Sequence, residues 1–260
     1  MPLRSGLLIM IPFRNKFCKN ILIYLKVNTT SRVCQIYKIS DNKTLHRNHK
    51  QTTTQKKMGY YIRVLGTSDP NIHIDDLISK LENDKLIAKF SLDEKETTDN
   101  WTFINVTDSN GNDLMQIERN PVVDGELGKE ELEEFRKYIK DYKPTSAVKW
   151  LDKYFDKVKV IYAFQLLDAS FDDNNFSIIT SIKSAIWNKT GGILQADNEG
   201  FSNEEGYHIL WQFTDNVTGN WNMAVRNFFG NWVNFTMDLG DQKQREDFLK
   251  GKVPKEATKL

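Results

Sequence analysis

The residues best suited to chemistry gather in residues 187–213, WNKTGGILQADNEGFSNEEGYHILWQF, where a helix end, a diglycine, an acidic loop and an aromatic segment meet. Four of them are carboxylates in a loop that also holds two asparagines: Asp197, Glu199, Glu204 and Glu205. Such oxygen ligands suit a hard cation, but their spacing does not follow the every-second-residue pattern of an EF-hand loop. We therefore expect a solvated acidic loop and no metal.

His208 follows the acidic loop in a segment, 207–213, that alternates like a strand. Alternation places His208 opposite Tyr207, on the less apolar face. An in-register hairpin after it brings Arg226 and Trp232 onto the same surface, and Trp, Tyr and Arg carry much of the binding energy in protein interfaces. The alternative is a solvated sheet face with His208 merely hydrogen-bonded. The candidate binding residues are Asp197, Glu199, Phe201, Glu204, Glu205, Tyr207, His208, Arg226 and Trp232.

Signatures of catalysis are absent from the sequence. After residue 57 the only histidines are His73 and His208, and both cysteines lie before that point, which argues against a zinc site or a Cys nucleophile. No HExxH, GxSxG, Walker or GxGxxG motif occurs. We therefore expect a protein that is not an enzyme and uses no cofactor. The alternative is a hydrolase or small-molecule-binding enzyme that uses Asp197 and Glu199 with His208, between two halves of the chain.

Charge is unevenly distributed along the chain. Residues 1–57 hold twelve Lys and Arg but one acid, Asp41, whereas residues 58–260 hold 24 basic and 34 acidic residues. The first segment therefore carries +11 and the rest −10. An acidic body disfavours nucleic acid and anionic membrane surfaces as partners, because both are bound by clustered Lys and Arg. We expect a soluble, cytoplasmic protein.

Residues 1–57 are predicted to be a basic, disordered leader. Their apolar run at 7–11, LLIMI, is far shorter than the roughly 20 residues that span a bilayer. The polar run at 41–57 is typical of disorder. The aromatic and β-branched residues after Met58 favour Met58 as the true start of translation, with a targeting peptide as the alternative.

The rest of the chain is predicted to alternate between strands and helices. Expected strands are 60–65, 88–92, 101–107, 114–119, 160–167, 193–196, 207–213, 221–226 and 232–239, and expected helices are 74–81, 129–140, 145–155, 175–190 and 241–249. The order β-α-β-β-β-α thus occurs twice. We expect an α+β fold of two similar halves, 58–158 and 159–260, each with helices on one face of a mainly antiparallel sheet.

The chain resembles uncharacterised bacterial proteins in three segments: YYIRVLG (60–66), GGILQADNEGFSNEEGYHILWQF (191–213) and MDLG (237–240). At the level of architecture, the small acidic α+β body also resembles some immunity proteins of bacterial toxin systems. That resemblance implies a protein that occludes its partner, and an acidic surface would suit a basic toxin. It brings no catalytic residues. We therefore expect a non-enzymatic, intracellular binding protein that docks a protein partner, while the oligomeric state stays open.

Overall fold

The computed structural model describes residues 9–15, 18–28, 33–39, 60–172 and 175–260. The first three ranges hold an antiparallel sheet of three strands, β1 (Ile9–Asn15), β2 (Cys18–Asn28) and β3 (Val33–Ile39). The polar run at 41–57 and Met58 lie outside the described residues. The disordered leader and the start at Met58 therefore stay predictions.

The main sheet has seven strands in the order β10-β9-β4-β8-β7-β6-β5, and each neighbouring pair is antiparallel. Its strands are β4 (Tyr60–Gly66), β5 (Lys89–Ser91), β6 (Phe103–Thr107), β7 (Asp113–Pro121), β8 (Val160–Leu166), β9 (Ile193–Ala196) and β10 (Gly200–Ser202). A smaller antiparallel sheet contains β11 (Asn220–Arg226), β12 (Trp232–Asp238) and β13 (Thr258–Lys259). The predicted α+β class with a mainly antiparallel sheet is confirmed.

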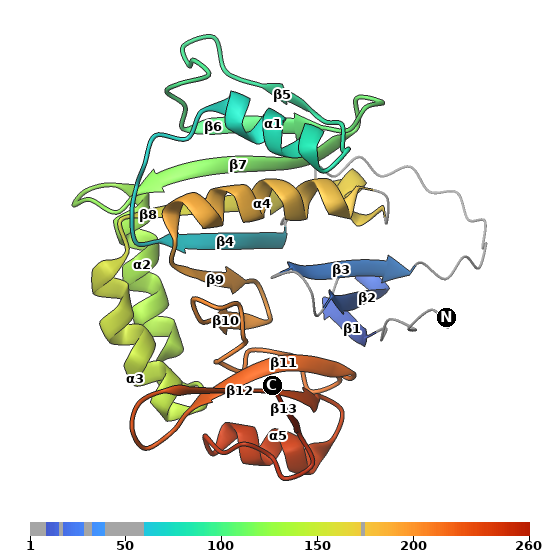
Figure 1. Ribbon diagram of the computed structural model, residues 1–260, viewed down its shortest axis with the longest axis vertical. Coiled ribbons are helices and arrows are strands. Elements are labelled where there is room, and N and C mark those ends of the chain that lie inside the picture. Colours follow the sequence, from blue (N-terminus) through green and yellow to red (C-terminus); the bar gives the residue numbers. More distant parts are fainter. Residues whose placement is uncertain (1–8, 16–17, 29–32, 40–59, 173–174) are drawn as a thin grey trace, which may run out of the picture.

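Helices pack on both sheets. The α-helices of the described residues are α1 (Ile74–Asn83), α2 (Leu127–Tyr138), α3 (Thr145–Tyr154), α4 (Phe176–Thr190) and α5 (Gln242–Leu249), joined by the 3-10 turns η1 (Ile139–Asp141), η2 (Phe155–Lys157) and η3 (Asp168–Phe171). Figure 1 shows α5 beneath the small sheet and one end of α3 beside it. None of the helices in the described part of the chain has the length and apolar character needed to cross a bilayer.

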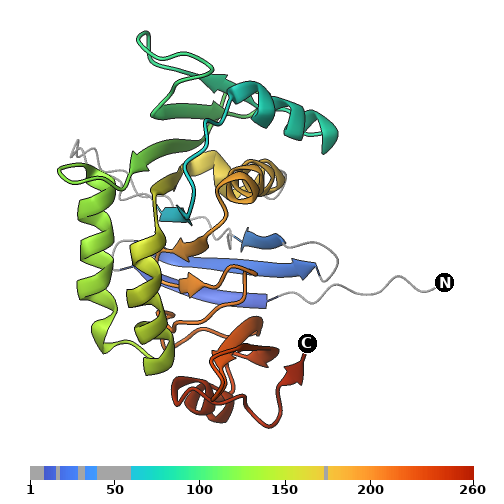
Figure 2. The ribbon, with the colours of Figure 1, turned by 60° about the vertical axis from the view of Figure 1, so that its left-hand side comes forward.

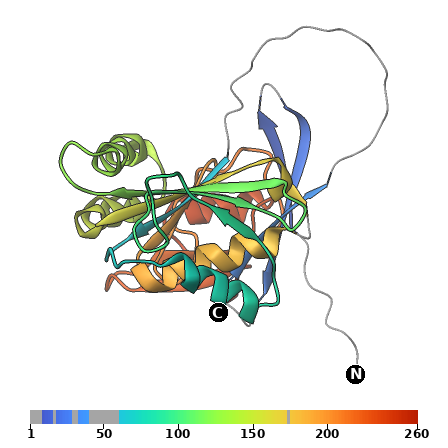
Figure 3. The same cartoon turned by 90° about the horizontal axis from the view of Figure 1, so that it is seen from above.

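Strand β8 explains why helices lie on both faces of the main sheet. Its sequence, VIYAFQL, is apolar at nearly every position, as in a strand that is buried on both sides. Tyr162 and Phe164 pack with α1 and α4, whereas Ile161, on the other face, packs with residues of α2 and α3. Seen from above, α1 and α4 lie together, away from α2 and α3 (Figure 3). The sequence predicts helices on one face only, but the second apolar face of β8 has to be covered as well.

The two expected halves share one sheet. Strand β8, from 159–260, lies between β4 and β7, from 58–158, and β9 pairs with the other edge of β4. On both sides of β4, backbone hydrogen bonds therefore join the two expected halves, 58–158 and 159–260, into one sheet. In Figure 2 these strands form the centre of the molecule, between α4 and the α2–α3 pair.

The strand expected at 207–213 does not form. The N–H of His208 donates to a carbonyl of β11, that of Ile209 to a carbonyl of β10, and that of Trp211 to the carbonyl of Lys143, before α3. Because successive backbone groups bond to three different segments, the chain crosses from the main sheet to the small one. It cannot extend beside a single partner strand.

Gly191 and Gly192 end α4, as predicted from the sequence, with φ angles of +64° and +92°. The backbone of β4 passes very close at this point: a Cβ added to Gly192 would lie 1.9 Å from the carbonyl oxygen of Leu65. The indole of Trp187 donates to the carbonyl of Gly192 at 2.9 Å. Glycine is therefore required here for both its conformation and its size.

Gly192→Ala is expected to lower the free energy of unfolding by about 3 kcal/mol or more, because backbone strain is joined by a clash with Leu65. Gly111→Ala is the matched control: its φ is +88°, but nothing lies within 4 Å of the added Cβ. That control should lose only about 1 kcal/mol. Urea denaturation measures both. Equal losses would show that the close approach to Leu65 has no energetic role.

Candidate functional site

The nine predicted binding residues do not form one site. They divide into a surface group, a buried pair and two separated carboxylates: Glu204, Glu205, Tyr207, Arg226 and Trp232; Phe201 and His208; and Asp197 and Glu199. The surface group surrounds the β11–β12 hairpin, where Arg226 and Trp232 stand opposite each other. It is the part of the prediction that the fold brings together.

The tip of the β11–β12 hairpin carries two exposed aromatic rings. Phe228 is 98% exposed and Phe229 is 83% exposed. The two rings meet edge to face, with their centroids 5.7 Å apart. Within 60–172 and 175–260, no other phenylalanine, tyrosine or tryptophan is as exposed as either of them. The expected strands 221–226 and 232–239 leave these two residues in the connection between them, but they are not among the predicted binding residues.

Hydrogen bonds hold the tip in one shape. Arg226 Nε donates to the carbonyl of Gly230 at 2.9 Å, and the N–H of Asn231 donates to Asn227 Oδ1 at 3.0 Å. The N–H of Asn227 donates to the carbonyl of Asn231 at 2.9 Å. Gly230 takes a φ of +83°, which favours glycine. The exposed rings are therefore presented by a closed loop.

A row of basic and aromatic side chains, which we call the cation–aromatic row, leads from the tip to α3. The guanidinium of Arg226 lies 5.7 Å from the ring centroid of Trp232, and Trp232 meets Trp150 edge to face at 5.0 Å. Trp150 lies 4.6 Å from the ring of Tyr154, and the ammonium of Lys157 lies 5.5 Å from that ring. Stacked rings and cation–π contacts orient one another. The row is three rings with a cation at each end.

Lysines extend the positive charge along α3. Lys153 follows Trp150 by three residues and Lys149 precedes Lys153 by four, so helical geometry places them on neighbouring positions of one flank. Both lysines are exposed. Among the described residues, no ion pair joins a carboxylate to Lys149, Lys153, Lys157 or Arg226. These charges are available to a partner.

Two exposed acids border the row. Glu205 accepts a hydrogen bond from an asparagine amide of β12 at 2.9 Å. Burial raises the pKa of Tyr154, and the carboxylate of Glu204 adds to the shift. Their loop folds around the buried Asn203, whose Oδ1 accepts from the N–H groups of Glu205, at 3.1 Å, and Tyr207, at 2.9 Å. The acidic loop is thus fixed beside the row by one buried amide.

Asp197 belongs to an ion cluster on the face of the main sheet that α2 covers. Arg63 of β4 donates to Glu131 at 2.5 Å, to Asp197 at 2.7 Å and to Gln195 at 2.7 Å. The Arg63 side chain is only 13% exposed. Burial raises the pKa of Glu131, although the charge of Arg63 opposes this shift. Arg63 and Glu131 lie in no motif, so only the fold reveals the cluster.

Glu199 faces the opposite side of the sheet from Asp197. It accepts a hydrogen bond from the hydroxyl of Tyr60 at 2.6 Å, and Tyr60 lies on the α4 side. The residue keeps some exposed surface, but its carboxyl group is enclosed, and this burial raises its pKa to about 7. Asp197 and Glu199 therefore cannot act together on one substrate. The ring of His208 interacts with the backbone of Glu199 rather than with its carboxylate.

His208 is buried rather than exposed on a polar face, contrary to the prediction. Its ring packs against Phe213 at 4.7 Å and Trp221 at 6.2 Å, and among the described residues its Nε2 has no hydrogen-bond partner. Burial lowers the pKa of His208 to about 4. The prediction fails because it relies on a strand at 207–213. The bridge from His208 to Met223 turns the ring toward the core of the small sheet.

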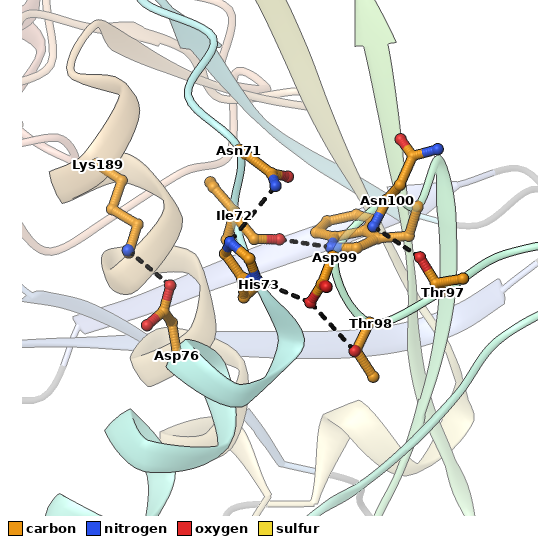
Figure 4. Close-up of polar contacts among 10 residues, drawn as sticks. Asn71, Ile72, His73, Asp76, Thr97, Thr98, Asp99, Asn100 and Lys189 are labelled. Carbon is orange, nitrogen blue, oxygen red and sulfur yellow. Dashed lines mark hydrogen bonds and ion pairs between the residues drawn. The ribbon is translucent and has the colours of Figure 1, made fainter.

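His73 belongs to a polar cluster just before α1 (Figure 4). Its Nδ1 lies 2.8 Å from Asp99 Oδ1, and its Nε2 lies 3.4 Å from the amide of Asn71. Beside it, the indole of Trp101 donates to the carbonyl of Ile72 at 2.7 Å. These contacts tie the 93–101 loop to the start of α1. In the described ranges, no group of three or more His, Cys, Asp or Glu side chains could hold a metal ion.

Lowering the pH from about 6.5 to about 4 is expected to reduce the free energy of unfolding through His208 by about 3 kcal/mol. Its pKa is lower in the folded chain than in the unfolded chain, so the unfolded state binds the extra proton across this window. Denaturant titrations at a series of pH values measure the effect. His208→Leu should flatten this part of the profile; an unchanged slope in that variant would assign it to other groups.

Arg63→Met is expected to lower the free energy of unfolding by about 3 kcal/mol, because Glu131 and Asp197 lose the cation that compensates their partly buried charge. Lys243→Met is the control. It removes an exposed ion pair with Glu256, and such pairs contribute little, so stability should stay nearly unchanged. Chemical denaturation at neutral pH compares the two. Similar, small losses in both variants would contradict a structural role for the Arg63 cluster.

No protein-family model matches this chain, and no curated protein or solved structure matches it either. Function is therefore inferred from the geometry of the surface alone. The likeness to immunity proteins remains an expectation based on composition and element order.

Proposed function

We propose that the chain is a non-enzymatic binding protein that docks a protein partner through its hairpin tip and cation–aromatic row. One observation carries the proposal: Phe228 and Phe229 project into water from a loop that is closed by hydrogen bonds. Burying an aromatic side chain of this size stabilises by roughly 1.5–3 kcal/mol. A partner with an apolar pocket would recover that free energy for both rings.

The composition and rigidity of this surface both support binding. Trp, Arg and other large side chains dominate the energetics of protein interfaces, and this surface has Trp150, Trp232 and Arg226 beside the tip. A loop that is already ordered loses less conformational entropy when it binds. The surface therefore combines apolar area with a low ordering cost.

The enzyme alternative has no comparable support. Asp197 is held by Arg63, Glu199 faces the other side of the sheet, and His208 is buried behind Gly200. These groups share no position from which they could reach one substrate. The proposed mode of action is occlusion, as in immunity proteins: the partner's functional surface is covered rather than chemically altered. We place this action in the cytoplasm.

The test begins with a photo-crosslinking amino acid at position 229 and, as a control, at position 87. Ile87 is 69% exposed and comes two residues before β5, the edge strand of the main sheet. Figure 1 shows β5 at the opposite end of the molecule from β11 and β12. We expect one protein to crosslink from position 229 and not from position 87. That protein is then identified, purified and titrated with the full chain.

The double variant Phe228→Ser/Phe229→Ser should weaken binding of the purified partner by about thirtyfold or more, equivalent to about 2 kcal/mol. Ile87→Ser removes a similarly exposed apolar side chain and should leave the affinity unchanged. Calorimetric titration provides the dissociation constants. Equal labelling from both positions, or equal affinity of the Phe228/Phe229 variant and the wild type, would reject the proposal.

A further inference from the structure

We propose that the cation–aromatic row binds carboxylate groups, so that the segment of the partner that docks here is acidic and apolar. This inference rests on the proposed function and specifies its partner. It reverses the expectation of a basic partner, which follows from net charge alone. The contacts that the row can make support the reversal.

The ionic side chains of the row itself have the opposite charge to the body as a whole. Residues 58–260 carry −10 in total, yet the row has a cation at each end, Arg226 and Lys157, and exposed Lys153 on the same flank. At physiological ionic strength, exposed charges are screened beyond about 8 Å. A docked segment therefore interacts with these cations more strongly than with acids on remote surfaces.

The cations also keep hydrogen-bond capacity for a ligand. A guanidinium has five N–H donors, and the Nε and Nη2 atoms of Arg226 each donate to the carbonyl of Gly230. An ammonium has three donors, and Lys157 is placed over Tyr154 by a cation–π contact rather than by a carboxylate. Carboxylates are the protein groups that make the strongest hydrogen bonds with such donors.

An acidic peptide suits the surface better than a nucleic acid strand. Single strands also bind to aromatic and basic surfaces, but they bring a phosphate at every nucleotide. Glu204 and Glu205 stand beside the row, where they would repel a continuous line of phosphates. A peptide can place separated carboxylates at the cations and an apolar side chain against the rings of Phe228 and Phe229.

The test pans a phage-displayed library of random peptides against the full chain, then measures selected peptides by fluorescence anisotropy. We expect the selected sequences to be enriched in Asp and Glu next to Phe, Leu or Trp. Lys153→Glu/Lys157→Glu should weaken their binding by about tenfold or more. Lys89→Glu/Lys95→Glu, which makes the same change in net charge at exposed lysines elsewhere, should leave it unchanged.

The outcomes separate this inference from the proposed function. One outcome would overturn the acidic partner and leave the docking surface standing: the selected peptides fail to bind Phe228→Ser/Phe229→Ser, but they are neutral or basic. The same conclusion follows if they fail to bind that variant but bind Lys153→Glu/Lys157→Glu as tightly as the wild type. Peptides indifferent to both double variants, or no selected peptides, count against both. Labelled oligothymidylate is titrated in parallel. Binding of this probe that is lost in Lys153→Glu/Lys157→Glu would make nucleic acid the ligand and overturn the inference.

Discussion

The burial of strand β8 on both faces determines how the rest of the molecule is arranged. A strand without a polar face must be covered on each side. Helices α1 and α4 cover one face of the sheet, and α2 and α3 cover the other. Packing against this second face places α3 where its Trp150 contacts Trp232 of the small sheet. The surface proposed for binding thus depends on a packing requirement at the centre of the main sheet.

Three buried or partly buried ionisable groups with shifted pKa values lie away from that surface, whereas burial also raises the pKa of Tyr154 within the row. Glu131, Glu199 and His208 are shifted chiefly by burial, and each is engaged in holding segments together or is packed within a core. Structural clusters perturb pKa values much as catalytic sites do. In this chain the shifted groups do not converge, so their shifts describe how the fold is held together. The surface proposed for binding is distinguished by exposed aromatic rings and by cations that form no ion pair with a carboxylate of residues 60–172 or 175–260.

Features that depend on neighbouring residues could be predicted from the sequence. The turn at Asn110–Gly111, the end of α4 at Gly191–Gly192 and the start of α5 at Asp241 are set by local backbone preferences. Features that depend on distant partners could not. Element order does not reveal that β8 inserts between β4 and β7, and alternation at 207–213 is misleading because no single strand pairs with it.

The candidate surface was partly predictable. Arg226 and Trp232 follow from the alternation of a regular hairpin, which pairs them directly. The segment NFFGN at 227–231 also contains a usable signal: Asn and Gly favour a turn, and turns lie on the surface, so two phenylalanines between them should be exposed. Trp150 could not be linked to Trp232 from the sequence, since that contact joins α3 to a different sheet.

The strand order has a consequence for synthesis on the ribosome. Strands β4 to β7 emerge before β8, and the partners of β4 among the described strands are β8 and β9. Until β8 emerges, the growing chain therefore presents β7 with one unpaired edge and β4 with neither of its edges paired. Unpaired edges and incomplete cores favour aggregation. The nascent protein is therefore most vulnerable just before its central strand leaves the exit tunnel.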